Sequence, residues 1–160
     1  MGGFVVRYWA NSAFLVVGAL PPFIGWFAGG GIFADERILW VALFFFIGQI
    51  PHFWLLLLMF GKEYALAGFP SLNKVFSDGQ IKRLSFTWIL ATIATALIVA
   101  STVLHSPVVL VLLLVYIFYL LYTFTSGIVV KNDFQVRPSF LKLNLLYLMM
   151  MILLIADSLR

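Results

Sequence analysis

Two polar side chains, Gln49 and His52, lie three residues apart inside the apolar run FFFIGQIPHFWLLLL. Residues with this spacing share one face of a helix, and Pro51 between them removes a backbone hydrogen bond. One interpretation is a contact to a substrate or a metal, because ionisable groups inside apolar spans commonly mark a functional site. The alternative is a hydrogen bond between helices at the proline kink. The two residues by themselves leave both interpretations open.

A second group of polar residues follows directly, in residues 61–83, GKEYALAGFPSLNKVFSDGQIKR. This segment is too apolar for a disordered tether, so we expect a cap of short interfacial helices. Its cations could hold a diphosphate, and a carboxylate could hold Mg²⁺ against that diphosphate. The alternative is the ordinary positive charge of a cytoplasmic membrane surface. The residues concerned, together with one from the N-terminus, are Arg7, Lys62, Glu63, Tyr64, Lys74, Asp78, Lys82 and Arg83.

Among the acids of this group, Glu63 is the one whose presence is least explained by membrane topology. It falls in the first turns after the second apolar run, beside Tyr64, where we expect it to face the polar pair on the helix below. The remaining polar residues suggest less chemistry. His105 falls in a two-residue turn, where we expect a solvated side chain, while Asp35 and Asp157 mark helix ends.

The elements that hold these residues must be membrane spans. Hydrophobic residues make up 64% of the 160 and charged residues 10%, against roughly 45–50% and about 25% in soluble domains. A water-soluble fold is thereby excluded. The net charge of +4 is typical of cytoplasmic loops near anionic lipids and predicts no nucleic-acid partner. Because the chain has no cysteine, disulfides, thiolate metal sites and a cysteine nucleophile are excluded as well.

Five apolar runs are long enough to cross a hydrocarbon core of about 30 Å as helices. The sequence therefore predicts an all-α polytopic membrane protein with a single helical domain over residues 1–160. Pro21 and Pro22 break the first run, Asp35 can cap the second, and Ser106 with Pro107 opens the fourth. The expected spans are about 8–31, 38–60, 84–104, 107–130 and 138–156, the last opened by Pro138.

The basic residues divide unequally between the two sides of such a protein. Only Arg37 and Arg160 of the ten fall on the side that holds the C-terminus. By the positive-inside rule we expect the N-terminus in the cytoplasm and the C-terminus outside. The eight on the N-terminal side are Arg7, Lys62, Lys74, Lys82, Arg83, Lys131, Arg137 and Lys142.

Four segments have the order and spacing of a known family: GALPPFIGW, QIPHFW, KEYALAGFPSL and LLYLMMMILLIADSL. Over nearly all its residues the chain resembles the C-terminal half of protohaem IX farnesyltransferases (haem O synthases), within the UbiA superfamily of intramembrane prenyltransferases. The resemblance implies the last five spans of a nine-helix bundle in a bacterial-type inner membrane, with a cytoplasmic active site. It also implies a fragment of a longer chain, or one half of a split protein that needs an N-terminal half.

The resemblance further implies a reaction of farnesyl diphosphate with haem B to give haem O. Mg²⁺ and basic residues would ionise the diphosphate, and the allylic cation would alkylate a haem vinyl group. Glu63 and Tyr64 match the family's second acidic motif, which makes them the expected catalytic residues, and Glu63 the expected metal ligand. Arg7 matches a basic residue suited to the diphosphate, and His52 with Gln49 falls where the porphyrin would lie.

The chain departs from the family pattern at two points. Lys62 stands where the family usually has another acid, and the first aspartate-rich motif has no counterpart in the 160 residues. Glu63, Asp78 and Asp133 are therefore not expected to form a complete magnesium site. The other residues assigned to substrate binding are Lys62, Lys82 and Arg83.

Three other functions are compatible with five spans. A UbiA-type enzyme could use a quinone or another aromatic acceptor, although PHFW argues against it. A degenerate, non-enzymatic relative could bind haem or lipid without turnover. A transporter is disfavoured, because the chain has neither paired intramembrane charges nor a repeat.

Overall fold

The computed structural model describes residues 18–32, 35–66, 76–130 and 134–158, together with helical backbone but no side-chain detail at Lys62, Tyr64, Ala65, Val129 and Val130. Throughout these residues the regular elements are helical, as the sequence predicts. They are α2 (Leu20–Ala28), α3 (Glu36–Leu66), α4 (Asp78–Thr102), α5 (Pro107–Thr125), the short π-helix η2 (Ser126–Val130) and α6 (Val136–Ser158).

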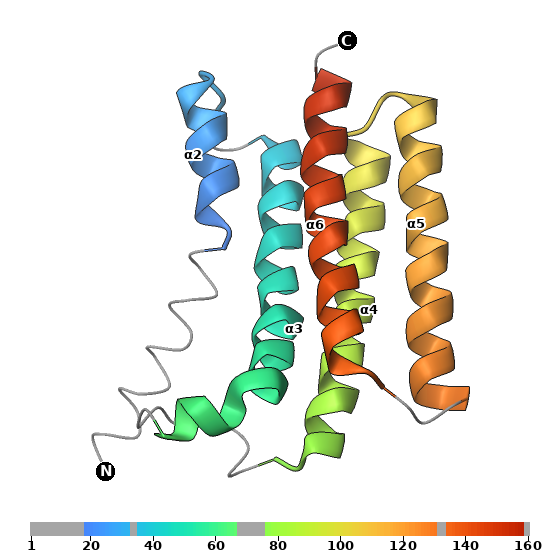
Figure 1. Cartoon of the computed structure of the whole chain (residues 1–160). Coiled ribbons are helices and arrows are strands. Elements are labelled where there is room, and N and C mark those ends of the chain that lie inside the picture. Colours follow the sequence, from blue (N-terminus) through green and yellow to red (C-terminus); the bar gives the residue numbers. More distant parts are fainter. Residues whose placement is uncertain (1–17, 33–34, 67–75, 131–133, 159–160) are drawn as a thin grey trace.

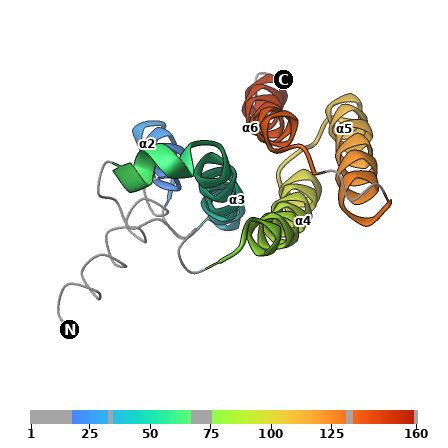
Figure 2. The ribbon, with the colours of Figure 1, turned by 60° about the horizontal axis from the view of Figure 1, so that its bottom comes forward.

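Helices α3, α4, α5 and α6 form an antiparallel ring, in which each helix packs against the next and α6 returns to α3 (Figures 1 and 2). Helix α2 packs on α3, outside this ring. The four ring helices are long and apolar enough to cross a membrane, and they correspond to the second to fifth expected spans. Of the first expected span, the structure describes only the end, where α2 has nine residues.

The interior of the ring is built from side chains spaced three or four residues apart. On α6 these are Ser139, Leu143, Leu146, Met150 and Leu153. Helix α5 repeats the pattern with Val109, Leu113, Ile117, Leu120 and Phe124. The opposite faces are also apolar, and include the exposed Val111, Val115 and Phe118 on α5 and Leu141, Leu148 and Ile152 on α6. An apolar outer surface of this kind is what a helix presents to lipid.

The helix starts agree with most of the capping signals. The Asp35 carboxylate accepts a hydrogen bond from the backbone N–H of Arg37 at 2.9 Å, which confirms the expected cap of α3. Helix α5 begins at Pro107 after Ser106, as expected, but the Ser106 hydroxyl makes no capping bond to this helix. Helix α6 begins at Val136, two residues before Pro138.

The helices around residues 61–83 extend beyond the expected membrane spans. Helix α3 continues to Leu66, and its last turns bend away from the ring towards the side on which α2 lies (Figures 1 and 2). Helix α4 starts at Asp78 instead of residue 84, because Ser77 and Gln80 form a reciprocal capping box. The Ser77 N–H donates to Gln80 Oε1 at 2.9 Å, and the Gln80 N–H donates to Ser77 Oγ at 3.4 Å. The rest of the expected cap, residues 67–75, lies outside the described residues.

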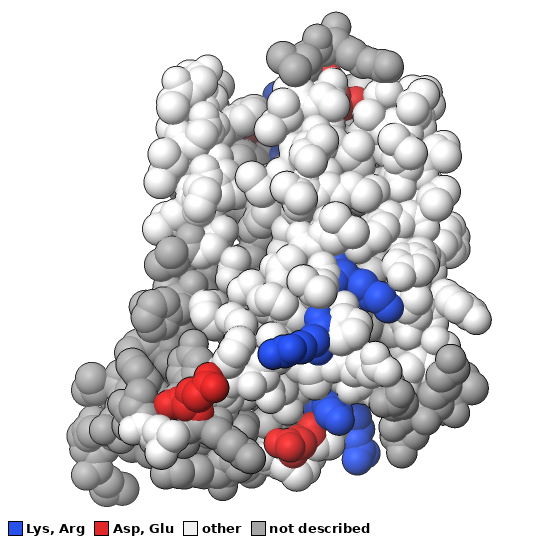
Figure 3. Space-filling view, viewed as in Figure 1, with Lys and Arg blue, Asp and Glu red and all other residues white. Residues whose placement is uncertain are grey.

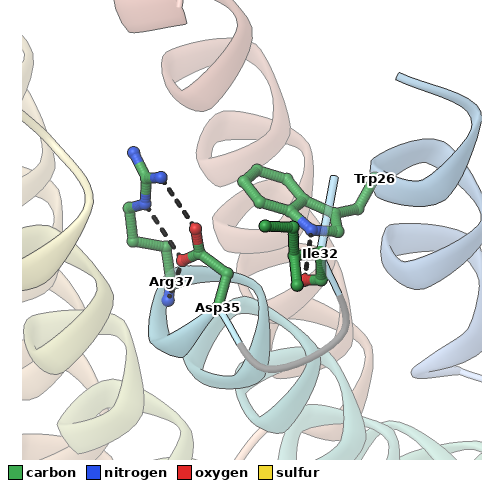
Figure 4. A network of polar contacts seen from close by, with 4 residues as sticks. All are labelled: Trp26, Ile32, Asp35 and Arg37. Carbon is green, nitrogen blue, oxygen red and sulfur yellow. Dashed lines mark hydrogen bonds and ion pairs between the residues drawn. The ribbon is translucent and has the colours of Figure 1, made fainter. Parts of the chain in front are cut away.

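The connection from α2 to α3 is held by a compact set of contacts (Figure 4). The indole N–H of Trp26 donates to the carbonyl of Ile32 at 2.9 Å, and the Arg37 guanidinium lies 5.6 Å from the Trp26 ring centre. Arg37 also donates two hydrogen bonds to Asp35, at 3.1 and 2.7 Å. These bonds, with that from the Arg37 backbone, lower the pKa of Asp35. Gly30 takes the positive φ of 81° that this turn requires.

Candidate functional site

His52 is half-buried on α3, at the contact with α6. Its Nδ1 lies 3.1 Å from Oδ1 of Asn144 on α6, and the centre of its ring lies 4.9 Å from the Phe140 ring centre. Pro51, directly before it, is buried. The hydrogen bond between helices, which the sequence left as one of two alternatives, is therefore present.

Asn144 is the residue that sequence reasoning missed. Its side-chain amide donates to the carbonyl of Phe140 one turn earlier in α6, at 2.9 Å, while its oxygen faces His52. The available signal was the segment LNLLYL, in which an amide and a phenol three residues apart interrupt an apolar helix. Such spacing places Asn144 and Tyr147 on one face.

Tyr147, on the same face of α6 as Asn144, contacts α3 one turn away from His52. Its hydroxyl donates to the backbone carbonyl of Gly48 at 2.6 Å. Gly48 is buried, and a Cβ at this position would lie 2.7 Å from both Cε1 and the hydroxyl oxygen of Tyr147. Among the described side chains, two polar contacts in register thus join the antiparallel helices, Gly48 with Tyr147 and His52 with Asn144.

Gln49 has a different neighbour from His52, although the two were expected to share one face. Its side chain lies against Gly18, in the turn that leads into α2, where a Cβ would collide with the Gln49 side chain. His52 faces α6 instead. Gln49 and His52 therefore do not share one neighbouring helix in the structure.

Basic side chains gather at the lower end of the bundle (Figure 3). Lys82 and Arg83 lie in the first turns of α4, and Arg137 and Lys142 in those of α6. At the other end, Arg37 is paired with Asp35. From Arg137 to Asn144 is seven residues, so at about 1.5 Å per residue His52 lies about 10 Å inside the basic end.

Lys142 lies between the basic end and the bundle interior. Its Nζ lies 5.5 Å from the ring centre of Tyr119, and its backbone carbonyl accepts a hydrogen bond from the Tyr116 hydroxyl at 2.8 Å. The half-buried Lys142 thus places its cation against the Tyr119 ring of α5. Sequence reasoning counted Lys142 for topology alone.

The remaining expected site residues are less fully described. Glu63 lies in the last turns of α3 with an exposed side chain. Lys62 and Tyr64 belong to the same helix, but their side chains lie outside the described part of the chain, and so does Arg7.

The described residues do not fit a magnesium site by themselves. Nowhere in the described ranges do three or more His, Cys, Asp or Glu side chains come together as a metal would require. Glu63, the expected ligand, is exposed. Of the two other acids weighed for this site, Asp78 lies in the first turn of α4 and Asp133 falls outside the described residues.

Comparison with known proteins decides the family. The model of the UbiA prenyltransferase family matches residues 6–146, which include every ring helix at least in part. The chain belongs to the UbiA prenyltransferase family.

Several curated relatives of this UbiA protein are protoheme IX farnesyltransferases. That of Geobacter sulfurreducens is 49% identical over 55 residues, 34% of this chain and 20% of the relative. That of Roseiflexus sp. (strain RS-1) is 41% identical over 78 residues, 48% of this chain and 14% of the relative. That of Ruegeria sp. (strain TM1040) is 35% identical over 143 residues, 82% of this chain and 44% of the relative.

The matched region spans less than half the length of each of these relatives. No solved structure matches the chain at a significant level. Membership of the UbiA family and four apolar helices make the chain an integral membrane protein.

Proposed function

We propose that this chain forms part of an intramembrane prenyltransferase that transfers a farnesyl group from farnesyl diphosphate to haem B, giving haem O. The observation that carries the proposal is the position of His52, an imidazole about 10 Å inside a basic helix end in a UbiA-family bundle. The protoheme IX farnesyltransferases among its relatives support this choice of substrates.

In the proposed reaction the two substrates meet at the basic end of the bundle. The allylic C–O bond of farnesyl diphosphate breaks, and the diphosphate leaves with the bonding electron pair. The terminal vinyl carbon of haem B bonds to the farnesyl carbon, which moves the positive charge to the inner vinyl carbon. Water adds there and loses a proton, which leaves a hydroxyethylfarnesyl side chain.

The residues of this chain are proposed to bind and orient the substrates. Arg83 and Arg137 are exposed cations at the basic end and suit diphosphate oxygens. His52 is proposed to contact the porphyrin, as an iron ligand or at the macrocycle edge. The sequence-based assignments of Glu63 and Tyr64 to catalysis, and of Gln49, Arg7, Lys62 and Lys82 to substrate binding, are kept as part of the proposal.

The ligands for Mg²⁺ are proposed to come from outside this set of residues. Since the described side chains hold no metal-binding cluster, we expect the carboxylates of an aspartate-rich motif supplied by a second half of the bundle to be needed. The proposal also keeps the N-terminus in the cytoplasm, where the diphosphate would be available.

The test is haem O formation in membranes of a strain without its own haem O synthase. Membranes would contain this chain, the first four spans of a homologue, or both, and haem O would be measured by chromatography and mass. Separately expressed helices can assemble in bilayers, because each span is a stable helix before packing. We expect haem O only from the pair, and lower formation with Arg137→Gln. Haem O from this chain alone would contradict the division of the site.

The position of His52 at the contact between α3 and α6 is also compatible with a second function. A relative that binds haem without turnover would need His52 but no diphosphate site. Haem binding that is lost in His52→Ala, combined with no haem O from any pairing, would support this function instead.

A further inference from the structure

The hydrogen bonds around Asn144 determine which nitrogen of His52 carries the proton. The carbonyl of Phe140 can only accept, so the Asn144 atom 2.9 Å from it must be the amide nitrogen. The atom 3.1 Å from His52 Nδ1 is then the amide oxygen, which can only accept. Nδ1 must therefore donate, and in the neutral ring the lone pair is on Nε2.

The orientation of the His52 imidazole is also fixed by its neighbours. Phe140 packs against it at 4.9 Å between ring centres, and Phe53 meets it edge-on at 5.8 Å. No hydrogen bond joins His52 Nε2 to another side chain or carbonyl in the described part of the chain. An imidazole held at Nδ1 with an available Nε2 is the arrangement in which histidine binds metals, and an acceptor bonded to the other nitrogen raises its basicity as a ligand.

We infer that Asn144 is a positioning residue, which holds His52 in the Nδ1–H tautomer so that Nε2 is presented to an electrophilic partner. This inference rests on the proposed function for the identity of that partner, the haem iron. The tautomer itself follows from the side-chain contacts and is tested separately from haem.

The tautomer can be read by ¹⁵N NMR of protein in detergent micelles, labelled only at histidine. The chain has two histidines, so His105→Gln leaves His52 as the single signal. At about pH 8 an imidazole of ordinary pKa is neutral, and the protonated and unprotonated nitrogens have well separated shifts. We expect the proton on Nδ1 in this background and a shift towards Nε2–H in Asn144→Leu, which removes the acceptor at similar volume.

Tyr147→Phe is the matched control. It removes the hydrogen bond from Tyr147 to Gly48, which also joins α3 and α6 one turn away, without touching the imidazole. Asn144→Asp is the rescue variant, because a carboxylate keeps the acceptor oxygen. We expect Nδ1 to stay protonated in both, and Asn144→Asp decides the question even where Asn144→Leu fails to fold.

The functional readout is titration of the same proteins with haem, followed at the Soret band. Loss of the group that orients a metal-binding histidine typically weakens metal binding by about 10–100-fold, so we expect this loss in Asn144→Leu. Tyr147→Phe and Asn144→Asp should bind as the parent does.

Each outcome separates the two claims. If the His52 imidazole keeps its proton on Nδ1 in Asn144→Leu, or carries it on Nε2 in Asn144→Asp, the inference is overturned, irrespective of the haem titration. A shifted tautomer with unchanged haem affinity, where His52→Ala weakens binding, overturns the positioning role. Equal haem binding by His52→Ala and the parent contradicts the haem contact in the proposed function, and the NMR result still decides the role of Asn144.

Discussion

The hydroxyl of Tyr147 on α6 donates a hydrogen bond of 2.6 Å to the backbone carbonyl of Gly48 on α3, 99 residues away in the sequence. The phenol can reach this carbonyl because Gly48 has no side chain. Its ring also meets Phe44 edge-on, with 5.8 Å between ring centres. Close approach at a glycine is a common way for membrane helices to pack.

A methyl group at Gly48 should disrupt this contact. Because the added Cβ would lie 2.7 Å from a rigid ring and from its hydroxyl, we expect Gly48→Ala to lower the free energy of unfolding by about 1–3 kcal/mol. The measurement is unfolding in mixed micelles, followed by circular dichroism. Gly25→Ala is the control, since a Cβ at Gly25 meets nothing within 4 Å. In a Tyr147→Ala background, Gly48→Ala should cost much less, and an equal cost would exclude the ring as the cause.

The carboxylate of Asp157 at the end of α6 stabilises the turn between α4 and α5. It accepts the backbone N–H groups of His105 at 2.9 Å and of Ser106 at 2.8 Å. We expect Asp157→Ala to lower the melting temperature and Asp157→Asn, which keeps one acceptor oxygen, to lower it less. Ser158→Ala is the neighbouring control. Equal melting temperatures for the alanine variant and the parent would show that this contact adds nothing to stability.

The pair of Asp35 and Arg37 should respond to acid. The hydrogen bonds from Arg37 lower the pKa of Asp35 from its ordinary value of 3.8. The pair therefore stabilises the folded connection above about pH 3.8, and this contribution is lost as the pH falls through the lowered pKa. Carboxyl ¹³C NMR titration checks this, and Arg37→Gln should return the pKa towards 3.8. A midpoint that does not respond to Arg37→Gln would contradict the assigned cause.

The orientation in the membrane can be tested with single cysteines, because the chain has none. Gly79 lies at the start of α4 with open space around it, and Ser158 is exposed at the end of α6. We expect an impermeant thiol reagent added to intact cells to label Ser158→Cys and not Gly79→Cys. Both should label after permeabilisation, and the reverse pattern in intact cells would mean an inverted protein.

The number and type of the ring helices were predictable from the sequence, but their lengths were not. Apolar runs locate the part of a helix in the hydrocarbon, while a helix continues through charged residues such as Lys82 and Arg83. The start of α4 did have a signal, since Ser77 and Gln80 have the spacing of a capping box.

Only one of the two side chains of the candidate site, that of His52, was predictable from the sequence. An ionisable residue in an apolar run identifies His52, whereas its partner Asn144 is 92 residues away. The α3–α6 register selects that partner, and a single sequence does not encode the register in any local pattern. Gln49 shows the same limit in reverse, because three-residue spacing predicts a shared face but does not say which helix each side chain meets.

The ring of helices has a consequence for synthesis. Three of its contacts join helices that are consecutive in the chain, but α6 closes the ring on α3, and no connecting segment sets their relative height. Asn144 is therefore synthesised 92 residues after His52, and the hydrogen bond between them can form only then. At about 5–20 residues per second, the wait is about 5–18 s. During these seconds the His52 imidazole lacks the side-chain partner that it has in the folded bundle.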